Sequence, residues 1–438
     1  MKVFIETMGC PKNFYDTENA KGILEQAGHE IAYTQEDADV MIVNTCGFIN
    51  DAKAESIGRI FEMDEMRREG QKLVVSGCLS TRYSEELFEE MPEVDAFIGV
   101  NEYELLPTIL ENLMASDERM KQVTECFAKP LPLLPRKLEE HPYTATLKIA
   151  EGCDNNCAYC VIPSIRGGFR SKRREDVIKE AEQLAQAGCR ELILIAQDVT
   201  NYGMDLYGER ILHELVEDLC KVEGIHWIRL MYCYEDRISD ELIEVMAREE
   251  KVVPYLDIPI QHSSDAVLAA MKRRSTEKSI LSTIERLRTA IPNIHIRTTL
   301  IVGFPGETEE DYEKLVDFVE KVEFDRLGVF AYSQEENTVA GEMENQIDEE
   351  VKAERLDAIM RRQVDISLES NRRKLDQVLE VLVEDRDPDG SYIGRTAYDA
   401  PEIDNSVLFT SEKELKPGDF VKVLIKDAFD YDLVGVEV

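Results

Sequence analysis

Short apolar runs of strand length alternate with helical stretches along most of this chain, and this alternation restricts the fold more than any other feature. In residues 1–116 the runs lie at 3–7, 40–45 and 72–77. Each contains three or four consecutive apolar residues rather than an apolar residue at every second position, which is typical of parallel strands covered on both faces. The pattern predicts an open α/β sheet of the Rossmann or flavodoxin type for this part of the chain.

A second and longer alternation occupies residues 143–375. Its apolar runs are 144–150, 191–197, 227–232, 255–260, 295–303 and 326–333. Strand–helix units repeated in this way predict a partial TIM-type (βα)6 barrel of parallel strands. The polar stretch 347–375 predicts a long helix that closes the unit.

The remaining segments differ in composition. Residues 117–142 are rich in proline and predict a linker. Residues 376–438 contain short β-rich runs separated by the turn signals DPDG and KPGD, so we expect a small antiparallel β-barrel. A chain of 438 residues is too long for one ordinary core, which agrees with a division into three domains.

The charge balance narrows the choice of partners. Acidic residues outnumber basic ones by 89 to 51, which gives a formal net charge of −38. Proteins that bind nucleic acid usually carry a basic surface, because contacts to phosphate supply most of their affinity. We therefore expect a basic protein as the main partner rather than nucleic acid. The alternative is that the acidic surface only keeps the protein soluble.

Neither a membrane span nor a secretory signal is expected. No apolar run approaches the ~20 residues that cross a bilayer. The first residues, MKVFIETMGC, lack a basic segment followed by an apolar one. We therefore predict a cytoplasmic protein that does not associate with membranes.

Three cysteines follow directly on the run 144–150. Cys153, Cys157 and Cys160 form a C-x3-C-x2-C triplet, and the loops at the carboxyl ends of barrel strands usually carry the chemistry. Three thiolates this close can bind three irons of a cubane cluster and leave the fourth iron open. The alternative is a structural zinc site. Zinc sites favour two pairs of ligands, and neither a second pair nor a histidine lies close by.

Cys10, Cys46 and Cys78 each follow one of the apolar runs of the first domain. The carboxyl ends of neighbouring parallel strands lie at the same edge of a sheet, so these thiols converge if the strands are neighbours. The sequence therefore predicts a second cluster, again with one open iron. The alternative is three unrelated core cysteines. The other cysteines show no spacing pattern and are interpreted as ordinary buried thiols: Cys126, Cys189, Cys220 and Cys233.

The triplet on the first loop of a partial barrel resembles the radical S-adenosylmethionine (radical SAM) enzymes. This resemblance implies a [4Fe–4S] cluster on the triplet, with S-adenosylmethionine chelated by its open iron. It also implies contacts to that cofactor from residues near the cluster. Two of the segments concerned have a simpler alternative. RGGFRSK (166–172) equally fits a solvated basic loop, and the glycines of GFPGET (303–308) fit a plain strand-to-helix turn. The residues implied are Tyr159, Arg166, Lys172, Gln197, Asp198, Gly303 and Gly306.

Two sets of three cysteines followed by a small β-domain resemble the methylthiotransferases, a branch of the radical SAM enzymes. The resemblance implies an N-terminal cluster domain, a radical SAM core and a C-terminal TRAM domain. Three segments are similar to the group that modifies a ribosomal protein: GCPKN (9–13), NTCGFINDAKAESI (44–57) and RLMYCYEDRI (229–238). Residues 377–438 carry fifteen acidic and six basic residues, which also suits a basic protein substrate better than tRNA.

The resemblance implies that a methylthio group is added to the β-carbon of an aspartate in small-subunit ribosomal protein twelve. One S-adenosylmethionine donates the methyl group at the second cluster, and another is the source of a 5′-deoxyadenosyl radical at the first. The implied partners are the basic ribosomal protein and an electron donor of the flavodoxin or ferredoxin type. No catalytic residue beyond the cluster ligands is assigned. Three alternatives stay open: a tRNA adenosine methylthiotransferase, a two-cluster electron-transfer protein, and a zinc-stabilised ribosome-binding module.

Overall fold

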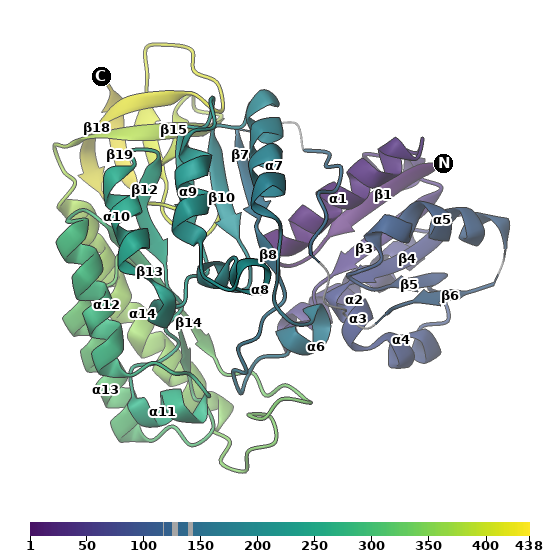
Figure 1. The fold of residues 1–438 in the computed structure, drawn as a ribbon, viewed down its shortest axis with the longest axis horizontal. Helices are drawn as coiled ribbons and strands as arrows, with labels where there is room; N and C mark the ends of the chain where they lie inside the picture. Colours follow the sequence, from purple (N-terminus) through teal and green to yellow (C-terminus); the bar gives the residue numbers. More distant parts are fainter. Residues whose placement is uncertain (117, 125–129, 139–142) are drawn as a thin grey trace.

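The computed structural model describes the chain except for residues 117, 125–129 and 139–142. The chain forms a six-stranded α/β layer at the N-terminus, a second six-stranded sheet with helices packed around it, and a small closed barrel at the C-terminus (Figure 1). The predicted fold class is confirmed, including the order of its three parts.

The N-terminal sheet is parallel throughout, with strand order β2-β1-β3-β4-β5-β6. Its strands are β1 (Lys2–Thr7), β2 (Glu30–Ile31), β3 (Val40–Thr45), β4 (Lys72–Gly77), β5 (Ala96–Ile98) and β6 (Met120–Gln122). Helices α1 (Pro11–Gln26) and α5 (Leu106–Ala115) pack on one face, and α2 (Asn50–Glu65) and α4 (Ser84–Glu90) pack on the other. Every residue of β3 is buried, because both faces of the sheet are covered.

Within the predicted linker, residues Met120–Gln122 form strand β6, which extends the N-terminal sheet by pairing in parallel with β5. These three residues therefore belong to the sheet, because a short strand beside an open sheet edge gains hydrogen bonds that composition does not reveal. Cys126 lies outside the described residues.

The central sheet follows the sequence order β7-β10-β11-β12-β13-β14, with all neighbours parallel. Its strands are β7 (Thr144–Lys148), β10 (Glu191–Ile195), β11 (Trp227–Leu230), β12 (Val252–Asp257), β13 (His295–Val302) and β14 (Arg326–Ala331). The main helices around it are α7 (Arg174–Gln186), α9 (Leu212–Cys220), α10 (Asp240–Arg248), α12 (Glu277–Ala290), α13 (Glu309–Val322) and α14 (Glu349–Arg372). This is the predicted partial barrel with its closing helix, and a small ribbon, β8 (Ala150–Glu151) with β9 (Arg170–Ser171), follows the first strand.

Short helical turns complete the first two domains and carry several residues discussed below. The α-helical ones are α3 (Cys78–Arg82), α6 (Ile162–Arg166), α8 (Met204–Tyr207) and α11 (Asp265–Ala270), and the 3-10 ones are η1 (Gln35–Asp37), η2 (Tyr103–Leu105), η3 (Val199–Asn201) and η4 (Glu235–Arg237). Within the part of the chain that the structure describes, no helix is long and apolar enough to cross a membrane.

The C-terminal domain is a closed barrel with the order β15-β16-β17-β19-β18. Its strands are β15 (Val378–Arg386), β16 (Tyr392–Thr396), β17 (Val407–Thr410), β18 (Phe420–Ala428) and β19 (Leu433–Glu437). The pairs are antiparallel as expected, except that β17 and β19 run parallel where the barrel closes. Closure leaves this small domain without an open sheet edge.

Buried ion pairs join the C-terminal barrel to the central sheet. Arg395 of β16 pairs with Glu191, the first residue of β10, and Arg326, the first residue of β14, pairs with Asp399. Glu191 also accepts a hydrogen bond from Arg229 at 3.0 Å. These contacts lie at the N-terminal ends of the central strands. The C-terminal domain therefore does not cover the carboxyl ends of these strands, where the N-terminal domain packs.

Candidate active site

The thiols of Cys153, Cys157 and Cys160, here called the barrel thiol group, lie in the loop that follows β7 and β8. Cys153 and Cys157 are buried and Cys160 is half-buried. The backbone N–H groups of Asn155 and Ile162 donate to the sulfurs of Cys153 and Cys160, each at 3.4 Å. Burial raises the pKa of Cys153 to about 11. Burial, together with the charges of Cys157 and Cys153, raises the pKa of Cys160 to about 12. The three thiols therefore lie close enough for their charges to act on one another.

The thiols of Cys10, Cys46 and Cys78, here called the N-terminal thiol group, lie at the carboxyl ends of β1, β3 and β4. Gly9 has φ +91°, and a Cβ atom there would lie 2.7 Å from the Cβ of Cys46, so this close approach requires glycine. Burial raises the pKa of Cys78 to about 11, and the charges of Cys10 and Cys46 add to the rise. The structure thus brings together three thiols that are far apart in the sequence.

Both thiol groups fit an iron–sulfur cluster better than a single metal ion. Within the described ranges, no three His, Cys, Asp or Glu side chains converge as ligands of one ion would. A cubane cluster does not require such convergence, because each thiolate binds a different iron. Backbone N–H groups that donate to the sulfurs, as in the barrel thiol group, are also typical of such clusters. The donor set of three sulfurs per group agrees with this chemistry.

Arg166, at the end of α6, lies between the two domains. Its Nη2 donates to the sulfur of Cys78 at 3.3 Å and to Oδ1 of Asn13 at 2.7 Å. Its Nη1 donates to Asp16 at 2.8 Å and to Glu151 at 3.1 Å. The guanidinium of Arg166 thus contacts a thiol of the N-terminal group directly. Its contact with the barrel thiol group is indirect, because Glu151 lies two residues before Cys153 in the chain.

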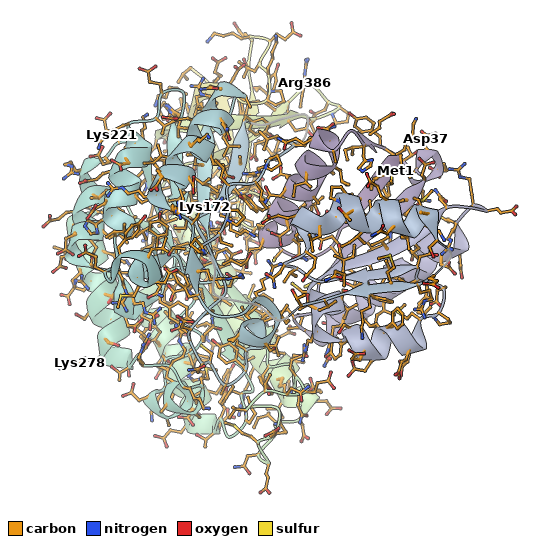
Figure 2. All side chains as sticks on the ribbon, turned by 45° about the vertical axis from the view of Figure 1, so that its right-hand side comes forward. Met1, Asp37, Lys172, Lys221, Lys278 and Arg386 are labelled. Carbon is orange, nitrogen blue, oxygen red and sulfur yellow. The ribbon has the colours of Figure 1, made fainter. Side chains whose placement is uncertain are left out.

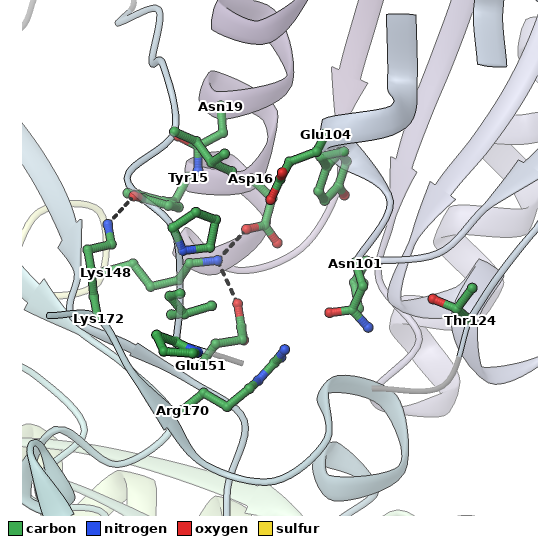
Figure 3. Close-up of a pocket in the computed structure, with 16 residues that line it drawn as sticks. Tyr15, Asp16, Asn19, Asn101, Glu104, Thr124, Lys148, Glu151, Arg170 and Lys172 are labelled. Carbon is green, nitrogen blue, oxygen red and sulfur yellow. Dashed lines mark hydrogen bonds and ion pairs between the residues drawn. The ribbon is translucent and has the colours of Figure 1, made fainter. Parts of the chain in front are cut away.

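Lys148 completes this buried network (Figure 3). Its Nζ lies 2.5 Å from Asp16 and 2.6 Å from Glu151. Burial alone would raise the pKa of Glu151, but the charges of Arg166 and Lys148 outweigh it and hold that pKa well below its usual range. A cavity of about 390 Å³ opens beside Lys148, Asp16 and Glu151. It borders the carboxylates that hold Arg166, next to the N-terminal thiol group.

Lys172 lies at the centre of the molecule, where the first two domains meet (Figure 2), whereas Lys221 and Lys278 project from the surface. Its Nζ donates to the Tyr15 hydroxyl at 2.8 Å and to Glu180 at 2.5 Å. Burial lowers the pKa of Lys172, but the charges of Tyr15 and Glu180 outweigh this and raise it. The structure therefore places Arg166 and Lys172, both expected beside the cofactor, in the contact between the domains.

Three other expected cofactor residues lie close to the barrel thiol group. Tyr159 packs with Phe304 in one apolar cluster, so the cysteine loop and the GFPGET segment are neighbours. Gly303 and Gly306 in that segment have φ +71° and +83°. A Cβ atom on Gly303 would meet the Cγ of Lys352 at 2.3 Å, whereas a Cβ on Gly306 would meet no atom within 4 Å among the described residues. Gly303 is therefore required by helix packing, and Gly306 leaves space open.

Gln197 and Asp198 lie at the carboxyl end of β10. The Nε2 of Gln197 donates to Glu151 at 2.7 Å, and Asn155 donates to Asp198 at 2.9 Å. The side-chain oxygen of Gln197 is buried without a hydrogen-bond partner in the part of the chain that the structure describes. That orphan acceptor is the kind of group that an amine-bearing ligand satisfies.

Two residues that contact the thiols, Tyr234 and Asn13, were not predicted from the sequence. The hydroxyl of Tyr234 lies 3.3 Å from the sulfur of Cys157. Asn13 donates to the carbonyls of Met8 and Thr45 at 2.9 and 3.0 Å and so holds the loops of two N-terminal cysteines together. Asn13 belongs to the segment GCPKN and Tyr234 to the segment RLMYCYEDRI, but the spacing of residues in these segments does not predict a contact with a thiol.

Comparison with known families divides the chain into the same three parts. Residues 2–99 match the Uncharacterized protein family UPF0004, residues 147–319 match the Radical SAM superfamily, and residues 377–438 match the TRAM domain. The barrel thiol group lies within the second match and the N-terminal thiol group within the first.

Relatives similar along nearly the full chain carry one name. Over 99% of this chain and 98% of the relative, identity is 48% to a "Ribosomal protein uS12 methylthiotransferase RimO" of Clostridioides difficile. A protein of the same name from Acetivibrio thermocellus is 49% identical, over 99% of this chain and 98% of the relative.

Solved structures support the fold. The radical S-adenosylmethionine methyltransferase TsrM from Kitasatospora setae, with cobalamin and a [4Fe-4S] cluster bound, aligns with a TM-score of 0.57 at 14% identity. The alignment covers 78% of this chain and 77% of that one.

Proposed function

The chain belongs to the RimO family of ribosomal protein uS12 methylthiotransferases, and we propose that it adds a methylthio group to the β-carbon of an aspartate in that ribosomal protein. It is a radical SAM methylthiotransferase. One observation carries the finer proposal: two groups of three thiols lie on either side of one domain contact, and a single arginine, Arg166, touches both sides. Such an arrangement suits a reaction that needs two metal centres near one substrate carbon.

We assign one [4Fe–4S] cluster to each thiol group. The barrel thiol group and the N-terminal thiol group each offer three sulfurs, so each cluster would keep one iron without a protein ligand. When bound, the clusters and two molecules of S-adenosylmethionine would supply the electron, the radical and the methylthio group, which no side chain can supply. A non-catalytic electron carrier usually ligates every iron, so two three-thiol sets argue against that alternative.

The chain itself has to bind and orient S-adenosylmethionine. We propose that Tyr159 packs near its adenine and that the backbone at Gly303 and Gly306 follows the nucleoside. We propose that Gln197, whose side-chain oxygen has no partner in the described residues, accepts a hydrogen bond from the cofactor's amino group. Asp198 is buried and engaged with Asn155, so we assign it to holding the loop of the barrel thiol group.

Arg166 and Lys172 have a different task in this proposal. The side chain of Arg166 bridges Asp16 and Cys78 of the N-terminal domain to Glu151, and that of Lys172 bridges Tyr15 to Glu180, so they fix the distance between the two thiol groups. Their contacts are buried, which excludes water from the space around the reacting centre. A rigid scaffold of this kind keeps both groups in place before the substrate arrives.

The substrate and the other partners follow from charge. A chain with a net charge of −38 attracts a basic protein, and ribosomal proteins are rich in lysine and arginine. We propose that electrons come from a flavodoxin or ferredoxin and that the reaction takes place in the cytoplasm.

The test is a direct product assay. Anaerobically reconstituted protein, reductant and S-adenosylmethionine are offered ribosomal protein uS12 or tRNA in parallel, and mass spectrometry looks for a gain of about 46 Da, the mass of a methylthio group replacing hydrogen. A gain on an aspartate of uS12 supports the proposal. A gain on tRNA adenosine instead keeps the chemistry and rejects the substrate. Bound zinc in a colourless protein that makes neither product would reject the cluster assignment.

A further inference from the structure

Lys12 is a buried lysine whose ammonium meets an aromatic ring rather than a carboxylate. It lies in the first turn of α1, two residues after Cys10, and only 8% of it is exposed. Its Nζ lies 3.4 Å from the centre of the Tyr232 ring, on the other side of the domain contact. Among the residues that the structure describes, no hydrogen bond or ion pair of this ammonium is recorded.

The other buried cations of this domain contact differ from Lys12. Lys148 pairs with Asp16, and Lys172 pairs with Glu180. Arg166 also pairs with Asp16. Burying an ammonium without an anionic partner is costly, and a cation–π contact offsets only part of that cost. Of these four cations, Lys12 is the one without an anionic partner among the described residues, so its charge is available to a ligand.

Tyr232 is held in an unusual conformation beneath the ammonium. Its φ of 61° lies in the left-handed region, which a bulky residue adopts only when its surroundings enforce it. Asp257 accepts a hydrogen bond from the Tyr232 N–H at 3.0 Å, and Val199 N–H donates to the Tyr232 carbonyl at 3.2 Å. Strain of this kind gathers at functional sites, where it fixes a side chain in advance.

The Lys12–Tyr232 pair joins two segments that each carry a thiol or a contact to one. Lys12 follows Cys10 of the N-terminal thiol group closely in the chain. Tyr232 is two residues from Tyr234, whose hydroxyl lies 3.3 Å from the sulfur of Cys157 in the barrel thiol group. A ligand anchored on the ammonium would therefore lie beside both segments.

We propose that Lys12 binds the side-chain carboxylate of the substrate aspartate and so selects the residue that is modified. This inference rests on the proposed function. The chemistry of the substrate fits, because the β-carbon of an aspartate is bonded directly to its carboxylate. An ion pair with Lys12 would neutralise the buried ammonium and place the reacting carbon one bond away from a fixed point. Tyr232 orients the ammonium as a positioning residue.

The experiment compares two peptides that carry the modified loop of uS12, one with the aspartate and one with asparagine in its place. Binding to the anaerobic, cluster-loaded enzyme is measured by fluorescence anisotropy. We expect the wild-type enzyme to bind the aspartate peptide at least ~10-fold more tightly, because an amide cannot pair with the ammonium. In Lys12→Met, the aspartate peptide should bind about as weakly as the asparagine peptide. Lys21→Met, further along the same helix, is the control and should keep the wild-type preference.

Lys12→Gln is a second variant in case Lys12→Met loads no clusters, and iron content checks loading in each. Lys12→Arg should restore part of the preference, because it returns the charge. The proposal is overturned if either neutral variant still prefers aspartate as strongly as the wild type. It is also overturned if these variants lose affinity for S-adenosylmethionine while the peptide preference stays. A wild-type enzyme that modifies tRNA and neither peptide would instead reject the proposed function.

Discussion

Arg166 donates a hydrogen bond to the sulfur of Cys78 at 3.3 Å, although the two residues belong to different domains. Cys78 comes from the N-terminal sheet and Arg166 from the loop region of the barrel that carries Cys153. The same guanidinium binds Asp16 and Glu151. The charge next to the N-terminal thiol group is therefore set by the other domain, so the two domains cannot shift without changing it.

Replacing this arginine should change both stability and redox behaviour. In Arg166→Met, the buried carboxylates of Asp16 and Glu151 share Lys148 as their remaining cationic partner among the described residues, and we expect the free energy of unfolding to fall by about 3–5 kcal/mol. A hydrogen bond and a positive charge at a cluster sulfur favour the reduced cluster, so their loss should lower its reduction potential. Denaturant unfolding of the metal-free protein and an EPR-monitored redox titration measure the two effects.

The redox titration is cleanest in a background where the barrel thiol group is replaced by alanine, so that one cluster remains. Arg166→Lys retains the charge but not the forked geometry, and its potential should lie between those of the wild type and Arg166→Met. An unchanged potential in Arg166→Met would show that the arginine does not act on this cluster.

The two thiol groups should be separable by mutation. We expect the triple variant Cys10→Ala, Cys46→Ala, Cys78→Ala to cleave S-adenosylmethionine reductively but to form no methylthiolated product. Its iron content should fall from about eight to about four atoms per chain, as one cubane cluster is lost. Iron analysis and chromatography of the cleavage products test this. Methylthiolated product from the triple variant would mean that the second cluster has been given the wrong role.

Stability should depend on pH through Lys374, near the contact of the central and C-terminal domains. Burial lowers the pKa of Lys374 to about 8, and the nearby positive charge of Arg326 adds to the shift. An unfolded lysine has a pKa near 10.4, so between pH ~8 and ~10.5 the unfolded chain binds more protons than the folded one. The contribution of this lysine to folding therefore becomes more favourable as the pH rises through that window.

The measurement is the difference in unfolding free energy between the wild type and Lys374→Met. Relative to the variant, the wild type should gain up to roughly 3 kcal/mol between pH 8 and pH 10.5. The exposed Lys426→Met is the control and should show no such trend. A difference that does not vary with pH would contradict the lowered pKa.

The C-terminal barrel should depend on one buried arginine. Arg395 pairs with Glu191, which also accepts from Arg229, and these side chains are at most 1% exposed. In Arg395→Met, Glu191 loses one of two cations, and we expect a loss of about 3–5 kcal/mol together with faster proteolysis of the C-terminal domain. Arg386→Met, at an exposed position of the same barrel, should stay within about 0.5 kcal/mol of the wild type. Equal protease resistance in both variants would reject this role for Arg395.

Much of the fold was predictable from local pattern. The apolar runs at 40–45 and 72–77 coincide with β3 and β4, because a strand covered on both faces buries consecutive apolar residues. The strand β6 was missed, since three residues carry no periodic signal and gain their place only from the neighbouring edge of β5.

The positions of the cysteines in the fold were predictable because each set follows the ends of predicted strands. The six cysteines follow strand ends, and parallel strands carry their loops to one edge. Arg166 and Lys172 were expected at the cofactor because they follow the cysteine triplet in sequence. In the structure, Arg166 contacts Asp16 and Lys172 contacts Tyr15, both on α1 of the N-terminal domain.

The sequence by itself determined where the strands and helices lie, which cysteines sit at strand ends and what overall charge the protein carries, because these properties depend on residues close together in the chain. Only the tertiary structure decided that Arg166 meets Cys78 and that Lys12 meets Tyr232. Such pairs join residues that are far apart in the chain and come together only when the two domains pack. Whether a buried charge meets a partner across the domain contact depends on that packing, which local periodicity does not predict.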